Sequence, residues 1–353
     1  MKRILALLLA LILIAGLVAC TSEPEVQEVY EPEVVETPEP VVPEEEDEEE
    51  EEEIAAGSDI HGAIHRIEYG DNVVYLFGTI HGGRAWWYPL ADVVEDALER
   101  ADVLVTEVGE IDEMGMVALM FEYAALPDGQ TWVEFLPSDA YDHFVEVIAA
   151  WEMPYEEVNI LHPSFLILLV TMELAQSLED DFEMGITADS LGVDAYVMNV
   201  ALERGLPILG LESMEQQLEI LYDPPFEVVV AQVMGFLPPE EMIEEMLQYA
   251  TLGQLADWFE TNNLDALNQS FADELDADSE DLAVIYMRET VMNWRSTYYA
   301  NEIARLLQET EEPTTFFVAV GLSHVIRSGA GEGFTDIVEQ LGLLGFTAVP
   351  LWR

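Results

Sequence analysis

Cysteine is almost absent from this chain, because Cys20 is the only one among 353 residues. An intramolecular disulfide is therefore excluded, and cysteine cannot contribute to a metal site in the body of the protein. Lysine is equally scarce, since Lys2 is the only one. Basic residues number 11 against 72 acidic ones, for a formal net charge of −61 at pH 7. This surplus of negative charge argues against binding to nucleic acid and against adhesion to anionic lipid.

The amino terminus has the pattern of an export signal. Two basic residues are followed by an apolar run over residues 4–18 and then by Ala19-Cys20. The run is shorter than the roughly 20 residues that a membrane-spanning helix needs. A charged start, a short apolar core and a small-residue cleavage site are typical of a secretory signal peptide, which we expect at residues 1–19.

The end of this signal, Leu17-Val18-Ala19-Cys20, resembles the bacterial lipobox, in which the cysteine is lipidated and becomes the first mature residue. We therefore expect a palmitate-type lipid on Cys20 that anchors the protein to the cell membrane on its extracytoplasmic face. The membrane would be a partner through this lipid alone. An ordinary signal peptide with an incidental cysteine is the alternative.

The segment after the signal is too polar to fold by itself. Residues 23–53 contain 17 acidic residues and five prolines and no basic residue. Self-repulsion and proline favour an extended chain, so residues 20–53 are expected to form the lipidated cysteine and a disordered acidic tether. Because positions 2 and 3 carry +2 and the tether carries −17 of the total −61, residues 54–353 carry −46.

Short apolar runs separated by helical patterns predict the fold of residues 54–353. An α/β fold follows, with a mostly parallel central sheet flanked by helices. Residues 110–190 and 214–285 read as a large helical insertion. The expected strands cover residues 73–77, 103–106, 207–211, 316–320 and 347–349, and the expected helices cover 90–100, 141–151, 193–204, 214–221, 287–308 and 335–344.

Glycine, histidine and glutamate follow the first four of these strands. The first strand leads into Gly78 and His81, and the second ends at Glu107. The third ends at Glu212, and the fourth leads into Gly321 and His324. Ligands of open α/β sheets bind beyond the carboxyl ends of the strands, so these side chains would converge on one crevice if the strands are neighbours. The glycines allow a close backbone approach where each strand turns away.

Two histidines and a glutamate are the usual ligands of a catalytic zinc site, and the same set suits manganese or iron. The pattern therefore suits a divalent metal held by His81, His324 and one of the two glutamates. The alternative is that these side chains only satisfy buried backbone groups at the strand ends. The remaining histidines, which are His61, His65, His143 and His162, have no comparable setting and are interpreted as surface or packing residues.

Four separated blocks and a closing pattern around Gly342, Gly345 and Val349 resemble signatures of the TraB/GumN family, and the resemblance spans roughly residues 60–353. The four blocks are Val74 to His81, Gly192 to Tyr196, Gly210 to Gln217 and Val318 to His324. The family includes the TIKI metal-dependent proteases and is related to haem-iron-binding ChaN-like proteins and to erythromycin-esterase-like hydrolases.

In the protease members the resemblance implies catalytic roles for His81, His324 and Glu107. The family's Arg-Asn pair matches Arg295-Ser296, so that the arginine is kept and the asparagine is lost. Arg288-Glu289 is a second possible register.

These features predict a metal-dependent hydrolase that cleaves a peptide or amide bond in a peptide or small-molecule substrate. Glu107 would be the third metal ligand or the base that activates water. Arg295 would bind a carboxylate or the developing oxyanion, or else form a structural ion pair. Glu212 would orient a histidine, or else act as a helix-start carboxylate. The alternative function is a non-catalytic lipoprotein that binds haem, iron or a peptide.

The lipid anchor predicts a change in location when Cys20 is replaced. Cys20→Ser removes the only acceptor for the lipid, so the protein should leave the membrane fraction or remain unprocessed. Fractionation with an antibody to the folded domain measures this. Recovery of wild-type mature protein in the medium, with an unmodified Cys20, would contradict the anchor.

Overall fold

The computed structural model describes residues 58–109, 113–177, 183–184, 192–249, 252–275, 277–326 and 333–352. The signal peptide, Cys20 and the acidic tether lie outside these residues. Within the described residues, no helix is long and apolar enough to cross a membrane.

A six-stranded sheet has the order β6-β4-β7-β2-β1-β8. Its first four strands are parallel neighbours: β6 (Ile208–Glu212), β4 (Val103–Val108), β7 (Thr315–Gly321) and β2 (Asn72–Thr79). On the far side of β2, β1 (Ile64–Tyr69) runs antiparallel to it, and β8 (Val349–Pro350) pairs antiparallel with β1. The expected α/β fold with a mostly parallel sheet is confirmed, and the four strands that precede the site motifs lie side by side.

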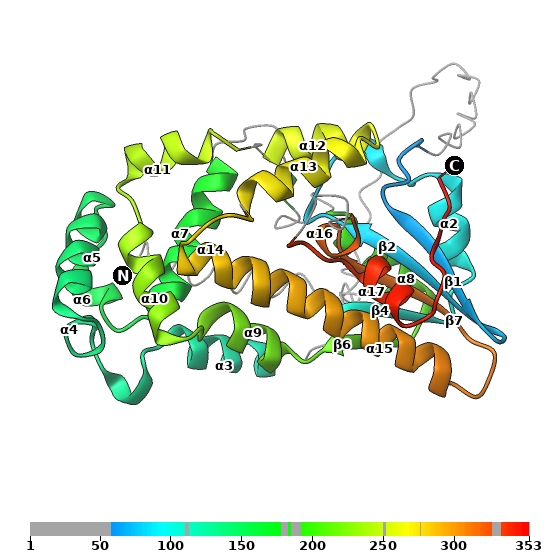
Figure 1. Ribbon diagram of the computed structural model, residues 1–353, viewed down its shortest axis with the longest axis horizontal. Helices are drawn as coiled ribbons and strands as arrows, with labels where there is room; N and C mark the ends of the chain where they lie inside the picture. The colour runs from blue at the N-terminus through cyan, green and yellow to red at the C-terminus, as the bar shows by residue number, and fades with distance from the viewer. Residues whose placement is uncertain are drawn as a thin grey trace, which may run out of the picture.

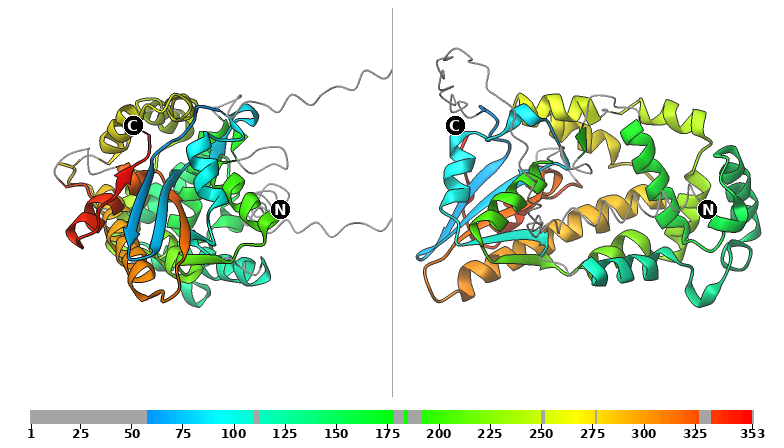
Figure 2. Two further views of the ribbon diagram at one scale, coloured as in Figure 1. Left: turned by 90° about the vertical axis from the view of Figure 1, so that its right-hand side faces the viewer. Right: turned by 180° about the vertical axis from the view of Figure 1, so that it is seen from behind.

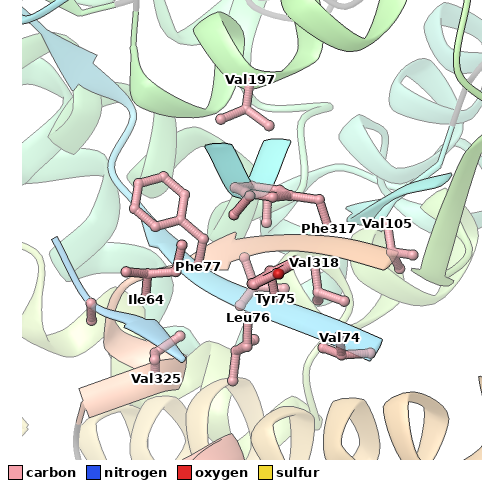
Figure 3. Close-up of a cluster of buried hydrophobic side chains, with 14 of the residues drawn as sticks. Ile64, Val74, Tyr75, Leu76, Phe77, Val105, Val197, Phe317, Val318 and Val325 are labelled. Carbon is pink, nitrogen blue, oxygen red and sulfur yellow. The ribbon is translucent and has the colours of Figure 1, made fainter. Parts of the chain in front are cut away.

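Helices cover both faces of this sheet, which explains the apolar strands. Phe77, Leu104 and Phe317 are completely buried. Figure 3 shows Val197 on one side of the strands and Val325 on the other. Val197 belongs to α8 (Val193–Arg204), while α15 (Arg295–Glu309) packs on β1, β2 and β6. A strand that is buried on both faces is stabilised by apolar residues at every position. This explains why the strands expected from the sequence show no alternation of apolar and polar residues.

The helices extend the molecule away from the sheet, in the direction in which the parallel strands end (Figures 1 and 2). Around the sheet lie α2 (Asp92–Glu99), α16 (Ser323–Ile326) and α17 (Ile337–Leu343) with α8 and α15. The helical part contains α3 (Glu113–Ala124), α4 (Trp132–Phe135), α5 (Ser138–Ala150), α6 (Tyr155–Val158), α7 (Pro163–Ser177), α9 (Met214–Tyr222), α10 (Phe226–Gly235), α11 (Pro239–Met246), α12 (Leu252–Glu260), α13 (Leu264–Glu274) and α14 (Leu282–Tyr286). The large helical insertion expected from the sequence is therefore present.

A few short elements complete the chain. They are the two-stranded pair β3 (Gly82–Gly83) and β5 (Glu183–Met184), the 3₁₀ turns η1 (Ala85–Trp87) and η2 (Pro127–Gly129), and the π-helical segment η3 (Met287–Trp294). The segment η3 joins α14 to α15. The single long helix expected over 287–308 thus begins as a π-helix.

Strand β1 is the main element that the sequence pattern did not predict. Its sequence is IHRIEY, in which two isoleucines are separated by His65 and Arg66. The strand lies near the sheet edge, and its last two residues are exposed. Its apolar content is therefore lower than that of the strands covered on both faces, and no continuous apolar run marks it.

Glycine is required where β2 meets the turn that carries His324. A Cβ on Gly78 would lie 2.5 Å from Cδ1 and 3.0 Å from Cα of Leu322. Beyond β4, a Cβ on Gly109 would lie 2.6 Å from the backbone nitrogen of Gly210. These close approaches let the strand ends and their following turns pack together at the carboxyl edge of the sheet.

His65 on β1 is buried without a charged partner. Only 7% of its surface is exposed, and its ring lies edge-on to Trp352 with 4.7 Å between ring centroids. Within the described residues, its Nδ1 has no hydrogen-bond partner. Burial lowers the pKa of His65 from 6.5 to about 4, because the charged imidazolium is poorly solvated there.

The lowered pKa of His65 predicts acid-sensitive stability. Between pH 6.5 and 4 the unfolded chain binds a proton at His65 more readily than the folded protein does. The free energy of unfolding should therefore decrease as the pH is lowered, by up to about 3 kcal/mol at pH 4. Urea denaturation across this range measures it. His65→Phe should flatten this part of the slope more than His61→Phe, the control at the other histidine whose ring contacts Trp352. Equal slopes in wild type and His65→Phe would contradict the assignment.

Candidate functional site

The predicted side chains follow the carboxyl ends of four adjacent parallel strands. Glu107 lies in β4 and Glu212 ends β6. His81 comes two residues after β2, and His324 lies in α16 directly after β7. In Figure 1, α16 lies between the sheet and the helical part, where these strands end. The expected convergence on one edge of the sheet is therefore present.

Arg295 joins the two glutamates. Its Nη2 donates to Glu107 Oε2 at 2.9 Å and to Glu212 Oε1 at 2.5 Å, and its Nε donates to Glu212 Oε2 at 3.3 Å. The side chains of Arg295 and Glu212 are 6% and 1% exposed, whereas that of Glu107 is 25% exposed. Glu107 is thus the carboxylate that faces outward, and Glu212 holds the arginine from the buried side.

Tyr299 and Gln217 complete this buried network. The Tyr299 hydroxyl donates to Glu212 Oε1 at 2.7 Å and accepts from Arg295 Nη2 at 2.5 Å. Gln217 Nε2 donates to both Glu107 and Glu212, at 3.4 and 3.3 Å. Tyr299 lies one helical turn after Arg295 on α15, so both side chains point from one face of that helix toward the strand ends.

The charge of Glu107 is fixed by its neighbours. Burial raises its pKa, but His324, Arg295 and the backbone N–H of Gly321, which donates to Oε1 at 2.7 Å, lower the pKa to about 2. The pKa of Arg295 is raised, because the nearby carboxylates outweigh its burial. Glu107 is consequently ionised at neutral pH, and the group of one guanidinium and two carboxylates leaves a negative charge at the crevice.

His324 is buried and oriented by Ser296. Only 3% of its surface is exposed, and its Nδ1 lies 2.8 Å from Ser296 Oγ. Its ring packs edge-on against Tyr299, with centroids 5.2 Å apart. The Ser296 hydroxyl thus supplies a hydrogen-bonding partner for the histidine. Nε2 is the ring nitrogen that this contact does not use.

His81 is exposed and oriented by Asp194. Its Nδ1 donates to Asp194 Oδ2 at 2.7 Å, and its side chain is 81% exposed. Asp194 and, to a smaller extent, Glu107 raise the pKa of His81 to about 9, against the opposing effect of desolvation. Asp194 comes from the start of α8, where a Cβ on Gly192 would lie 2.5 Å from the carbonyl oxygen of His81. Glycine there lets α8 reach the histidine.

Metal-binding histidines commonly have one ring nitrogen fixed by a partner and the other directed at the ion. Both His81 and His324 have Nδ1 fixed in this way, and the adjacent carboxylate is ionised. The donor types therefore suit a divalent cation. As they stand, however, no three His, Cys, Asp or Glu side chains in the described ranges are grouped closely enough to hold a metal ion.

The structure refines several roles expected from the sequence. Glu212 contacts Arg295, Tyr299 and Gln217. The helix start that follows it is capped by Ser213, whose hydroxyl accepts from the N–H of Gln216. Arg295 is the arginine of the site, whereas Arg288 pairs with Glu289.

Four residues of the site were missing from the prediction: Asp194, Gln217, Ser296 as a histidine partner, and Tyr299. Two signals were available for them. Asp194 and Gln217 lay in blocks of family resemblance, and Ser296 and Tyr299 share a helix with Arg295. The other histidines lie outside this network; His143, for example, hydrogen-bonds the carbonyl of Phe236 in the helical part.

The sequence model of the TraB/PrgY/gumN family matches residues 63–336. The chain belongs to this family. The match includes both Gly-x-x-His segments, both glutamates, Arg295 and nearly the whole sheet. The chain matches no curated protein and no solved structure.

The buried network predicts a stabilising role for the Tyr299 hydroxyl. Tyr299→Phe keeps the ring but removes a group that bonds both Arg295 and Glu212, so the free energy of unfolding should fall by about 1–3 kcal/mol. Urea denaturation at pH 7 measures this. Tyr298→Phe is the matched control at the preceding position of α15, where the ring stacks on Trp294, and should change stability by less than about 0.5 kcal/mol. Equal losses in the two variants would contradict the network.

Proposed function

We propose that this TraB-family protein is a metal-dependent hydrolase that cleaves a peptide or amide bond. The observation that carries the proposal is the matched orientation of His81 and His324, each with Nδ1 held by a partner beside the ionised Glu107. The two Nε2 atoms would bind the divalent ion, which is zinc, manganese or iron. When bound, the ion supplies a Lewis acid that lowers the pKa of a water and polarises the scissile carbonyl.

The local charge supports a cation at this place. Two carboxylates and one guanidinium leave a negative charge, and the carboxylates of Asp194 and Glu107 favour a proton on His81. A divalent ion would replace that proton, since histidine binds metals in its neutral form. Because the His81 side chain is 81% exposed, it can turn toward Glu107 and His324 without disturbing the core.

The environment of Glu107 favours one of its two expected roles. A carboxylate with a pKa of about 2 accepts a proton poorly near neutral pH, so Glu107 suits the role of third ligand better than that of base. Its Oε1 and Oε2 are positioned by Gly321 and Arg295. Glu212 and Tyr299 act through Arg295 and are positioning residues. Arg295 sets the charge and orientation of Glu107.

The place of action follows from the amino terminus. A lipid on Cys20 would hold the domain at the extracytoplasmic face of the membrane, and the acidic tether would separate it from the lipid. The negative charge of residues 54–353 disfavours nucleic acid and anionic headgroups, so a peptide or small-molecule substrate outside the membrane is the proposed partner.

Metal content and hydrolysis test the site together. His81→Ala and His324→Ala should each remove most bound metal and essentially all hydrolysis, and the double variant should be little worse than either, because ligands of one ion act as a unit. Glu107→Gln should lose metal as well, as expected of a ligand. Elemental analysis of the purified domain and release of amines from a peptide mixture measure the two properties.

His143→Ala is the control, because His143 bonds the Phe236 carbonyl away from the site. It should retain metal and activity. Loss of metal in His143→Ala with full retention in both site variants would overturn the assignment. A wild-type protein with no divalent ion but with a Soret absorption band would support haem binding in place of hydrolysis.

A further inference from the structure

Trp86 is an unusually exposed indole close in sequence to His81. It lies in η1, five residues after the histidine, and 67% of its surface is accessible. The adjacent Trp87 is completely buried. Single exposed apolar residues are common on proteins, so exposure alone does not indicate a site. The contacts that hold the Trp86 ring provide the further observation.

Two polar neighbours hold the Trp86 ring in place although it faces solvent. Its Nε1 donates to Glu260 Oε1 at 3.1 Å, and the Arg84 guanidinium lies 5.7 Å from the centre of its ring. Arg84 is itself fixed by Glu260 at 2.6 Å and Asp257 at 2.8 Å, and its side chain is only 15% exposed. The indole therefore needs little further ordering when a ligand binds it, which favours binding.

Trp87, and not Trp86, is the tryptophan that packs this segment into the folded domain. Its Nε1 donates to the same Glu260 carboxylate at 3.0 Å, and its ring packs on Phe259 with centroids 5.5 Å apart. Trp87 thus anchors the segment to α12 without help from the exposed ring of its neighbour. The large accessible surface of Trp86 has no comparable role in the core.

The position of Trp86 links it to both histidines. Glu260 is the last residue of α12, which contacts β3 directly after His81 and packs against α13. Helix α13 in turn contacts α16, which carries His324. Arg84 does not make this an anion site, because two carboxylates already neutralise its charge.

We propose that Trp86 is a recognition subsite for an aromatic side chain of the substrate, on the His81 side of the candidate site. This inference rests on the proposed hydrolase function. Stacking on a rigid indole favours an aromatic side chain over a small polar one. The −46 charge of the domain also disfavours acidic substrates.

Binding can be tested without turnover by NMR of the indole N–H groups. The chain has seven tryptophans, and Trp86→Phe identifies the signal of Trp86. Titration with N-acetyl-phenylalanine amide should shift this signal and should saturate at about tenfold lower concentration than with N-acetyl-serine amide. Trp151 is the control, because its indole N–H donates to the Leu237 carbonyl in the helical part of the molecule. No shift at Trp86, or an equal shift at Trp151, would overturn the subsite.

Hydrolysis provides the second measurement. For a cleaved peptide with an aromatic residue near the scissile bond, Trp86→Ala should raise KM about tenfold and leave kcat within about twofold. Its melting temperature should stay within about 3 °C of wild type, whereas Trp87→Ala should lower it much more. A fall in kcat with unchanged KM would contradict a recognition role. If the Trp86 signal responds as expected but no peptide is cleaved, the subsite stands and the hydrolase function fails.

Discussion

A single buried guanidinium holds the candidate site together. Arg295 lies between Glu107 at the end of β4 and Glu212 at the end of β6, and it reaches them from α15. Removing one partner of a buried ion pair typically costs about 3–5 kcal/mol, because the remaining charge is left uncompensated. Without Arg295, two carboxylates would face each other in a domain that already carries −46. The arrangement of the strand ends therefore depends on this arginine.

The same interaction determines what chemistry the crevice favours. Arg295 and His324 keep Glu107 ionised, with a pKa of about 2, so Glu107 is suited to attract a cation and poorly suited to accept a proton. Tyr299 extends the network toward the histidine, since its hydroxyl bonds Glu212 and its ring packs on His324. The charge and orientation of Glu107 are thus set by buried neighbours.

Much of this site could be predicted from sequence, because its residues directly follow strands that are recognisable in the sequence as apolar runs. Each of the four parallel strands is a continuous apolar run, and a parallel sheet places all the carboxyl ends at one edge, so His81, Glu107, Glu212 and His324 converge. The sheet order was not predictable in the same way. It depends on how the chain crosses between strands, and β1, whose apolar residues are interrupted by His65 and Arg66, gave no signal.

The partners of the histidines depend on packing between distant elements. Asp194 reaches His81 from the start of α8, 113 residues along the chain, and Ser296 reaches His324 from α15. The sequence alone does not identify either residue as functional, since aspartate near a helix start and serine within a helix are common in any protein. The resemblance to the family's Arg-Asn pair gave no reason to expect a contact between Ser296 and His324. In three dimensions the serine hydroxyl contacts the histidine.

The two histidines, though equivalent as sequence motifs, differ in a way that bears on mechanism. His324 is 3% exposed and is enclosed by Ser296 and Tyr299, whereas the His81 side chain is 81% exposed and held mainly by Asp194. One proposed ligand is therefore fixed by the core, and the other can reorient at little cost in packing. Since the described residues do not group three metal donors together, the proposed metal site would require movement of the exposed histidine. The segment immediately after it, from β3 to Trp87, is anchored to α12, so any such movement is confined to the few residues between β2 and that anchor.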